Sequence, residues 1–329
     1  MREAELKKLI VEEFLAQIED PRVERTRKHP LETILVLSVL AVICGADSFV
    51  GIEKYGKAKK DWLSTFLDLS AGVPSHDTIG RVFAVLDPKM LTLAFQRWTA
   101  AMATASQEKL IAIDGKTLRR SFKNAYEHAF VHMVSAWSSQ NGVVLGQVKT
   151  DDKSNEITAI PALLELITVK KALVTIDAAG AQTEIADKIV DKGGDYLLAV
   201  KANQPLLYAS VVEHFEGVSY WSEDFFETEE SGHGRHEVRR IWVSDKLENI
   251  ATRERWRKLT TVMRVQSMRT AGDKTSTEDR YYICSKKPSA KQALEAVRSH
   301  WGIENSLHWV LYVAFREDDC RVRAQNAAA

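Results

Sequence analysis

The order of apolar and polar positions divides the chain into a helical amino-terminal part and a mixed part that begins near residue 106. In the first part, apolar side chains recur three and four positions apart, the spacing that gathers them on one face of a helix. Asp20-Pro21, Gly72-Val73-Pro74 and Asp87-Pro88 interrupt these stretches, as turn residues do. The pattern predicts helices over Glu3–Ile18, Leu31–Cys44, Phe49–Phe66, Asp77–Leu86 and Pro88–Ala103.

Short apolar runs bounded by turn residues follow, and they predict strands. Asn141-Gly142 is a strong hairpin signal between two of these runs. A meander of three strands, followed by two strands that alternate with helices, predicts a mixed α/β sheet. The expected strands are Leu110–Ile113, Ala129–Trp137, Val143–Thr150, Ala172–Ile176 and Asp195–Val200, and the expected helices are Glu156–Ile167 and Glu184–Lys192.

The pattern changes again after residue 202, where strand-like runs occur without helices between them. These runs are Phe225–Thr228, His236–Val243, Thr260–Met268 and Arg280–Cys284, with a turn at Ala271–Lys274. Helical spacing returns from Ser289 to Ala314. We therefore expect four segments: a helical domain over 1–105, an α/β core over 106–202, a β-rich insertion over 203–288 and a carboxyl-terminal part of the core over 289–329.

Composition narrows the class of protein. Of 329 residues, 45% are hydrophobic and 27% are charged, values typical of a globular protein. The 45 basic and 45 acidic residues give zero net charge, so any affinity for nucleic acid must come from local patches. The most apolar run, Leu31–Ala46, is too short for a membrane span. Cys44, Cys284 and Cys320 lie far apart, which indicates a reducing cytoplasm.

Two acids follow buried strands directly. Asp114 ends the run from Leu110, and Asp177 ends the run from Ala172. Open α/β sheets bind ligands at the carboxyl ends of their strands, and Gly115 is expected to turn the chain away after Asp114. The basic residues around Asp114 suit a metal ion that must meet a polyanion, whereas a solvated loop acid is the simpler alternative.

A third acid, Glu304, lies in the helical stretch near the carboxyl end. His300 and His308 are one helical turn away on either side, so the three side chains are expected to share a face. Gly302 within this stretch argues against an unbroken helix.

These three segments resemble the DDE catalytic triad of bacterial insertion-sequence transposases. The similarity is greatest to the ISAs, or H-repeat-associated, branch of the IS4-like superfamily, and it extends over nearly the whole chain. The blocks that carry it are Ile113–Arg119, His132–Trp137, Lys153–Ile157, Val174–Asp177, Gly193–Tyr196, Lys201–Gln204, Gly232–Arg235 and His300–Glu304.

The resemblance implies a ribonuclease-H-like mixed sheet with helices on both faces, an all-helical amino-terminal domain and a β-rich insertion before the last catalytic helix. It implies that Asp114, Asp177 and Glu304 are catalytic and hold two Mg²⁺ ions, with Mn²⁺ as a substitute. Such a pair of ions, about 3.5–4 Å apart, serves in-line displacement at phosphorus. Water would free the 3′-hydroxyl at a transposon end, and that hydroxyl would attack target DNA. We expect a homodimer on DNA, associated with the nucleoid in the cytoplasm.

Several basic residues are candidates for contact with DNA phosphates, and the loop at Gly232–His236 is the best of these because glycines let two backbones approach. Solvation is the alternative for each. The candidates are Lys116, Arg119, Arg120, Lys201, His233, Arg235, Arg239 and Arg298. The tryptophans Trp221, Trp242 and Trp256 either stack on a base or pack in the core, which is their more common fate. The amino-terminal domain either recognises transposon ends or covers the catalytic sheet.

The chain departs from its relatives in several places. Val297, His300 and Leu311 stand where the superfamily has Tyr, Arg and Lys, and Tyr312 stands where the branch has Asp. Relatives continue with another helix beyond Ala329, so we interpret the chain as truncated or decayed. Two alternatives to a transposase therefore stay open: a metal nuclease of the same fold that only hydrolyses, and an inactive DNA-binding remnant. Glu317 is an alternative third ligand. The end sequence, the target and hairpin formation are left undefined.

Overall fold

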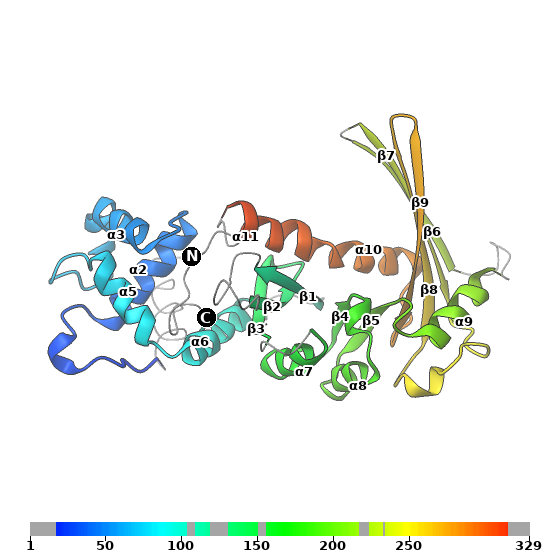
Figure 1. Cartoon of the computed structure of the whole chain (residues 1–329), viewed down its shortest axis with the longest axis horizontal. Coiled ribbons are helices and arrows are strands. Elements are labelled where there is room, and N and C mark those ends of the chain that lie inside the picture. Colours follow the sequence, from blue (N-terminus) through cyan, green and yellow to red (C-terminus); the bar gives the residue numbers. More distant parts are fainter. Residues whose placement is uncertain are drawn as a thin grey trace, which may run out of the picture. The chain divides into compact units, whose positions relative to one another are not determined.

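The computed structural model describes residues 18–103, 109–118, 131–150, 156–216, 224–232 and 234–314. Figure 1 labels the elements. The described residues fall into two compact units: one contains those within 1–104, 117–132 and 308–329, and the other contains those within 105–116 and 133–307. Among the described helices, none combines the length and the apolar character needed to cross a lipid bilayer.

The first unit is helical through residue 103, as the apolar periodicity predicted. Its elements are η2 (Glu24–Thr26), α2 (Leu31–Ile43), α3 (Phe49–Ala58), α4 (Lys60–Leu63), α5 (His76–Val85) and α6 (Pro88–Ala103). The single helix predicted over Phe49–Phe66 is two helices, because α3 ends at Ala58 and α4 begins at Lys60. The helix predicted over Glu3–Ile18 lies outside the described residues, apart from its last position.

Helix α2 is the centre of this unit. Most of its side chains are buried, and they pack with α3, α5 and the segment around Leu67 in one apolar cluster. A helix that is apolar on nearly every side must be covered by its neighbours. This explains why the most apolar run of the sequence forms a core helix.

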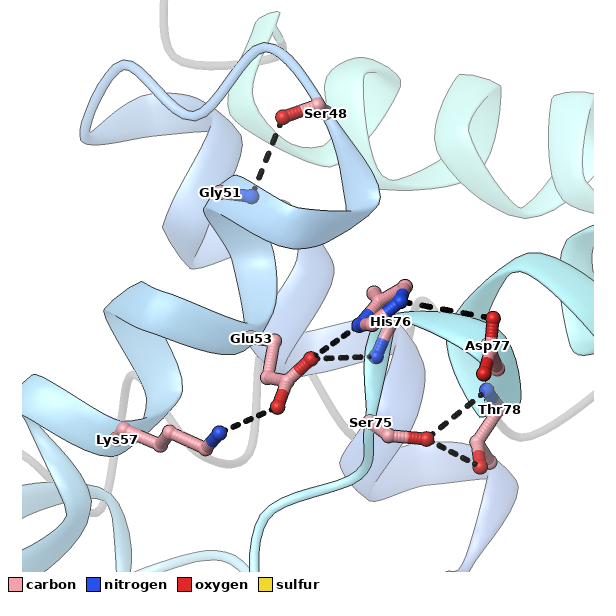
Figure 2. Close-up of polar contacts among 8 residues, drawn as sticks. All are labelled: Ser48, Gly51, Glu53, Lys57, Ser75, His76, Asp77 and Thr78. Atoms are coloured by element: carbon pink, nitrogen blue, oxygen red, sulfur yellow. Dashed lines mark hydrogen bonds and ion pairs between the residues drawn. The ribbon is translucent and has the colours of Figure 1, made fainter.

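Serine caps define where α3 and α5 begin (Figure 2). The Ser48 Oγ accepts a hydrogen bond from the Gly51 amide at 3.2 Å, and the Ser75 Oγ accepts one from the Thr78 amide at 3.3 Å. Each bond satisfies an amide that has no partner inside its own helix. Ser75, expected from the sequence to be a capping residue, has that role.

Glu53 on α3 holds the first residue of α5 (Figure 2). The Glu53 Oε2 accepts a hydrogen bond from the backbone amide of His76 at 2.9 Å. The same oxygen lies 2.6 Å from the His76 Nδ1. The Lys57 Nζ lies 2.5 Å from the other oxygen. One acid therefore connects the two capped helices.

Glu53 predicts how this unit responds to acid. The hydrogen bonds from Lys57 and His76 lower the pKa of Glu53 from 4.5 to about 2. A carboxyl whose pKa is lower in the folded state stabilises the fold above its unfolded pKa, and that stabilisation is lost as the pH falls from 4.5 toward 2. We expect Glu53→Gln to lower the Tm at pH 7 and to flatten the loss of Tm below pH 4.5, measured by thermal unfolding. Glu32→Gln is the control, and an unchanged pH profile in Glu53→Gln would contradict the prediction.

The second unit is built on a nine-stranded mixed sheet with the order β3-β2-β1-β4-β5-β9-β8-β7-β6. Strands β1, β4 and β5 are parallel, whereas β2–β3 and all pairs from β5 through β9 to β6 are antiparallel. The strands are β1 (Lys109–Leu118), β2 (Val131–Ser138), β3 (Val143–Lys149), β4 (Ala172–Ile176), β5 (Asp195–Val200), β6 (Asp224–Gly232), β7 (Arg235–Ser244), β8 (Thr261–Ala271) and β9 (Lys274–Cys284). The predicted mixed sheet is confirmed.

The β-rich segment continues this sheet, because β9 pairs with β5 (Figure 1). Its strands are longer than the sequence predicted: β9 begins at Lys274, whereas the apolar run begins at Arg280. The added half of β9 is exposed on both faces and lacks the alternation that reveals a strand, so only its backbone pairing with β8 defines it.

Helices cover both faces of the sheet, as expected. Along β5, Tyr196, Leu198 and Val200 pack in the cluster that contains side chains of α7, α8 and α9, whereas Leu197 and Ala199 pack in the cluster that contains α10. This alternation is the two-residue period of a strand buried on both sides. The helices and turns of this part are α7 (Glu156–Leu166), η3 (Ala178–Gly180), α8 (Thr183–Asp191), α9 (Pro205–Glu216), η4 (Arg253–Arg255), α10 (Ala290–His300) and the π-helix η5 (Ile303–His308). The next helix along the chain, α11 (Trp309–Val313), belongs to the first unit.

Candidate active site

Asp114 and Asp177 occupy neighbouring positions on adjacent parallel strands. The register pairs Ile113 of β1 with Ile176 of β4, so each aspartate is the next residue along. One expectation is wrong: β1 does not end at Asp114, and Gly115 does not turn the chain, because the strand runs on to Leu118. Strand β1 lies between β2 and β4, and it extends beyond the end of β4, because the last pair between them is Ile113 with Ile176.

Both aspartates face the side of the sheet that α10 covers. Leu110 on β1 and Leu173 on β4 pack in the apolar cluster of α10. Because every second residue of a strand faces the same side, Asp114 shares the face of Leu110, and Asp177 shares the face of Leu173. Each strand therefore has an apolar residue that packs in the cluster of α10 and, four residues later on the same face, an acid.

Glu304 lies beyond the end of α10. That helix ends at His300, and the π-helix η5 begins at Ile303. The helical stretch expected over Ser289–Ala314 is thus interrupted next to Gly302, the residue that argued against an unbroken helix. In a π-helix the backbone hydrogen bonds join residues five apart instead of four, so the spacing of Glu304 and His308 is not that of the regular α-helix assumed from the sequence. Single π-turns occur often at functional sites.

The three acids influence one another electrostatically. Burial raises the pKa of Asp114 to about 7, the amide of Gly115 opposes this, and the charges of Glu156, Glu304 and Asp177 add to it. Although the Glu304 side chain is exposed, partial desolvation and the charge of Asp177 raise the pKa of its carboxyl, and the charge of Arg280 lowers it. Asp177 lines one cavity and Glu304 lines another, and the two cavities share Arg280 and Trp301, so Glu304 lies on the same side of the sheet as Asp177.

Glu156, the first residue of α7, was missed as a candidate. It lies in the block Lys153–Ile157, but nothing in the local pattern distinguishes it from a solvated acid at a helix start. Its effect on Asp114 depends on tertiary structure alone.

These acids suit a divalent cation by their chemistry. Hard ions such as Mg²⁺ prefer carboxylate oxygens, and a nearby cation would relieve the repulsion that raises the pKa of Asp114. In this structure, however, no three His, Cys, Asp or Glu side chains of the described segments converge closely enough to hold one ion. The donor type and charge fit, and binding would require the side chains to move closer together.

The segment Lys201–Gln204 supports Asp177 and the loop after it. The Lys201 Nζ lies 3.4 Å from the Asp177 Oδ1. The Asn203 Nδ2 donates to the Ala178 carbonyl at 2.6 Å, and the Gln204 Nε2 donates to the Ala181 carbonyl at 2.9 Å. The sequence predicted Lys201 as a DNA contact, whereas here it pairs with an acid of the site.

Gly180 lets this loop pack closely. A Cβ at this position would lie 2.5 Å from the Ile176 Cγ2 and 2.8 Å from the Ile160 Cδ1. Only glycine fits between the end of β4 and α7 without displacing these side chains, so the loop after Asp177 is tightly fixed.

Two cavities border the acids. One, of about 230 Å³, is lined by Asp177 and Lys201, and the other, of about 620 Å³, is lined by Glu304. Arg280 and Trp301 belong to the walls of both.

The larger cavity is also lined by three of the predicted DNA contacts, Arg235, Arg239 and Arg298. Arg235 is exposed at the start of β7. Arg298 forms a two-pronged ion pair with Glu230, at 2.5 and 3.0 Å, and Arg239 lies 3.3 Å from the same carboxylate. Two of these arginines are thus paired with an acid on β6.

The remaining sequence candidates divide into four groups. Lys116 lies on β1, two residues beyond Asp114 and on the same face. Trp242 and Trp256 are 4% and 3% exposed, so core packing is confirmed for both. Tyr312 is exposed on α11. Outside the described residues lie Arg119, Arg120, Trp221, His233 and Glu317.

Comparison with known proteins adds to this geometry. The family model "DDE_Tnp_1-associated" matches residues 12–99, and the model "Transposase DDE domain" matches residues 105–329. "Putative transposase YncI" of Escherichia coli O157:H7 is 45% identical over 322 residues, which are 96% of this chain and 83% of the relative. "H repeat-associated putative transposase YhhI" of Escherichia coli K12 is 40% identical over 332 residues, 98% of this chain and 87% of the relative.

A solved structure is also similar, at a low level. It is a cryo-EM structure of a piggyBac transposase synaptic complex with hairpin DNA, 12% identical, with a TM-score of 0.39 over 94% of this chain and 66% of that chain. The DDE-domain match, by contrast, covers more than half of the sequence, and relatives at 40–45% identity align along nearly all of it. This chain therefore belongs to the transposase DDE-domain family.

Proposed function

We propose that this chain is a metal-dependent DNA transposase that cuts transposon ends and joins the freed 3′-hydroxyl to target DNA. The observation that carries the proposal is the proximity of three acids that are distant in sequence: Asp114 and Asp177 each follow a residue of one strand pair, and the charges of Glu304 and Asp177 add to the burial that raises the pKa of Asp114. The strand order β3-β2-β1-β4-β5 supports a ribonuclease-H-like core. Residues 1–105 then form an accessory DNA-binding domain, and pairing of two ends implies a homodimer on DNA.

In this proposal Asp114, Asp177 and Glu304 would hold the divalent ions, with Asp114 a ligand of both ions, Asp177 of one and Glu304 of the other. Two bound ions would supply Lewis-acid activation of the phosphate and of the attacking hydroxyl. The chain's own residues set the conditions for this chemistry. Asn203 and Gln204 fix the loop after Asp177, and Lys201 balances the charge of Asp177.

The test uses the purified full chain, labelled duplexes that carry its inverted-repeat ends, and Mg²⁺. Joined products would support the transposase. Nicks without joining would favour a nuclease that only hydrolyses. Retention of DNA in a shift assay, without cleavage in Mg²⁺ or Mn²⁺, would favour an inactive remnant.

DNA binding is expected to weaken steeply with salt. If about six phosphates are neutralised, affinity falls roughly a thousandfold between about 50 and 200 mM salt, because counterions are released on binding. Shift assays over a salt series measure the slope. A flat response would contradict a phosphate-dominated interface.

Two arginines of the larger cavity offer a matched comparison. Arg235→Ala is expected to reduce the salt slope by about one, the effect of losing one phosphate contact. Arg298→Ala is expected to change it less, because the Arg298 guanidinium is already paired with Glu230. Equal slopes for Arg235→Ala and the unmodified chain would remove Arg235 from the interface.

A further inference from the structure

Four consecutive residues at the carboxyl end of α10 each contact a different part of the sheet. Arg298 lies 2.5 Å from Glu230 of β6, and the Ser299 carbonyl accepts a hydrogen bond from the Ser139 Oγ at 3.2 Å. The His300 Nδ1 lies 3.0 Å from the Oγ1 of Thr175 on β4. The Cζ of Arg280 on β9 lies 4.4 Å from the centroid of the Trp301 ring. The end of α10 is therefore fixed from four directions just before the chain reaches Gly302.

His300 makes the contact that leads to Asp177. Its partner Thr175 is 2% exposed and lies two residues before Asp177, on the same face of β4. His300 itself is half-buried and lies four residues before Glu304. A single side-chain hydrogen bond thus connects the strand that presents Asp177 to the segment that presents Glu304.

Three residues separate His300 from Glu304, and one of them is Gly302. Gly302 separates Glu304 from α10, and a Cβ at Gly302 would meet nothing within 4 Å. Glu304 is exposed within the π-helix, so packing around its own side chain does little to fix it. Ligands of a reaction centre must be held to within about 0.5 Å, and supporting hydrogen bonds supply that precision.

We propose that His300 is a positioning residue, whose hydrogen bond to Thr175 holds the Glu304 segment in register with the strand that carries Asp177. The inference rests on the proposed function, since register between these acids matters only if they serve one metal centre. It assigns a role to a residue that stands where the superfamily has an arginine.

The test measures Mn²⁺ binding to the full chain without DNA, from the loss of the free-ion electron paramagnetic resonance signal. We expect His300→Ala to weaken Mn²⁺ affinity about 10–100-fold, the usual effect of removing a group that orients a ligand. His300→Asn places an amide near the position of Nδ1 and is expected to restore most of this affinity. Thr175→Val removes only the hydroxyl and is expected to resemble His300→Ala, and the double variant should be no weaker than either alone, because one interaction is lost in all three.

Leu294→Ala is the matched control for a purely structural effect. Leu294 is a buried residue of α10 that packs in the same apolar cluster. Its truncation should lower the Tm and leave Mn²⁺ affinity unchanged at temperatures where the protein is folded. Equal losses of affinity in Leu294→Ala and His300→Ala would overturn the positioning role.

Failure of the inference and failure of the proposed function give different results. If Glu304→Gln loses Mn²⁺ affinity while His300→Ala and Thr175→Val bind as the unmodified chain does, His300 does not position Glu304 and the metal centre stands. If Glu304→Gln and Asp114→Asn also bind as the unmodified chain does, the metal centre itself is wrong. In cleavage assays, we expect His300→Ala to cleave DNA more slowly than the unmodified chain and to bind DNA with the same affinity.

Discussion

Neutralising any one of the three acids is expected to abolish cleavage of transposon ends while DNA binding persists. Asp114→Asn, Asp177→Asn and Glu304→Gln each remove a charged metal ligand and leave the size of the side chain nearly unchanged. We expect the cleavage rate to fall on the order of a thousandfold or more, because members of a catalytic set act as a unit. Single-turnover cleavage of a labelled end duplex in Mg²⁺ measures the rate, and a shift assay measures binding.

Glu278→Gln is the control for a carboxylate that borders both cavities without belonging to the triad. It pairs with Arg280 at 2.9 Å, and its neutralisation should reduce cleavage far less. Substantial cleavage by any triad variant would remove that acid from the metal centre. Loss of DNA binding together with cleavage would indicate a structural defect instead.

The second large effect concerns stability: Asp114→Asn is expected to stabilise the metal-free protein at pH 8. The pKa of Asp114 rises from 3.8 to about 7 on folding, so the folded state holds its proton more tightly than the unfolded state. Stability is then lost as the pH rises from 3.8 to about 7, and the full cost applies above that range. At about 1.4 kcal/mol per pKa unit, the cost is of the order of 4 kcal/mol.

Urea unfolding of chelator-treated protein measures this cost. The difference between Asp114→Asn and the unmodified chain should shrink as the pH falls from 7 toward 4, because Asp114 then carries its proton in both states. Asp191→Asn is the control: its partner Arg257 is exposed like itself, and such surface pairs contribute little. Equal stability of Asp114→Asn and the unmodified chain at pH 8 would show that Asp114 carries no unfavourable charge.

The two predictions have one physical cause. Burial and the neighbouring acids make the ionised form of Asp114 unfavourable without a cation. The same repulsion makes the site suitable for a divalent ion, because metal ligands must be deprotonated. The Asp114→Asn variant should therefore be more stable and inactive, a trade between stability and function that is frequent at active sites.

The sequence by itself determined the mixed α/β sheet, most of its strands, and the position of Asp114 and Asp177 directly after apolar runs. Apolar runs such as Ala172–Ile176 report burial, and an acid directly after such a run can be located from local order alone. The helix α9, which begins at Pro205, escaped prediction although proline is common at the first position of a helix.

Only the tertiary structure decided the rest. It joined the β-rich segment to the main sheet through β5 and β9, and it changed the helix into a π-helix at Glu304. It also paired His300 with Thr175, 125 residues away. Periodicity tells which side of an element is buried, but it does not tell which distant residue covers that side. Partners, register and charge coupling arise when the chain closes on itself, and the chemistry of this site depends on all three.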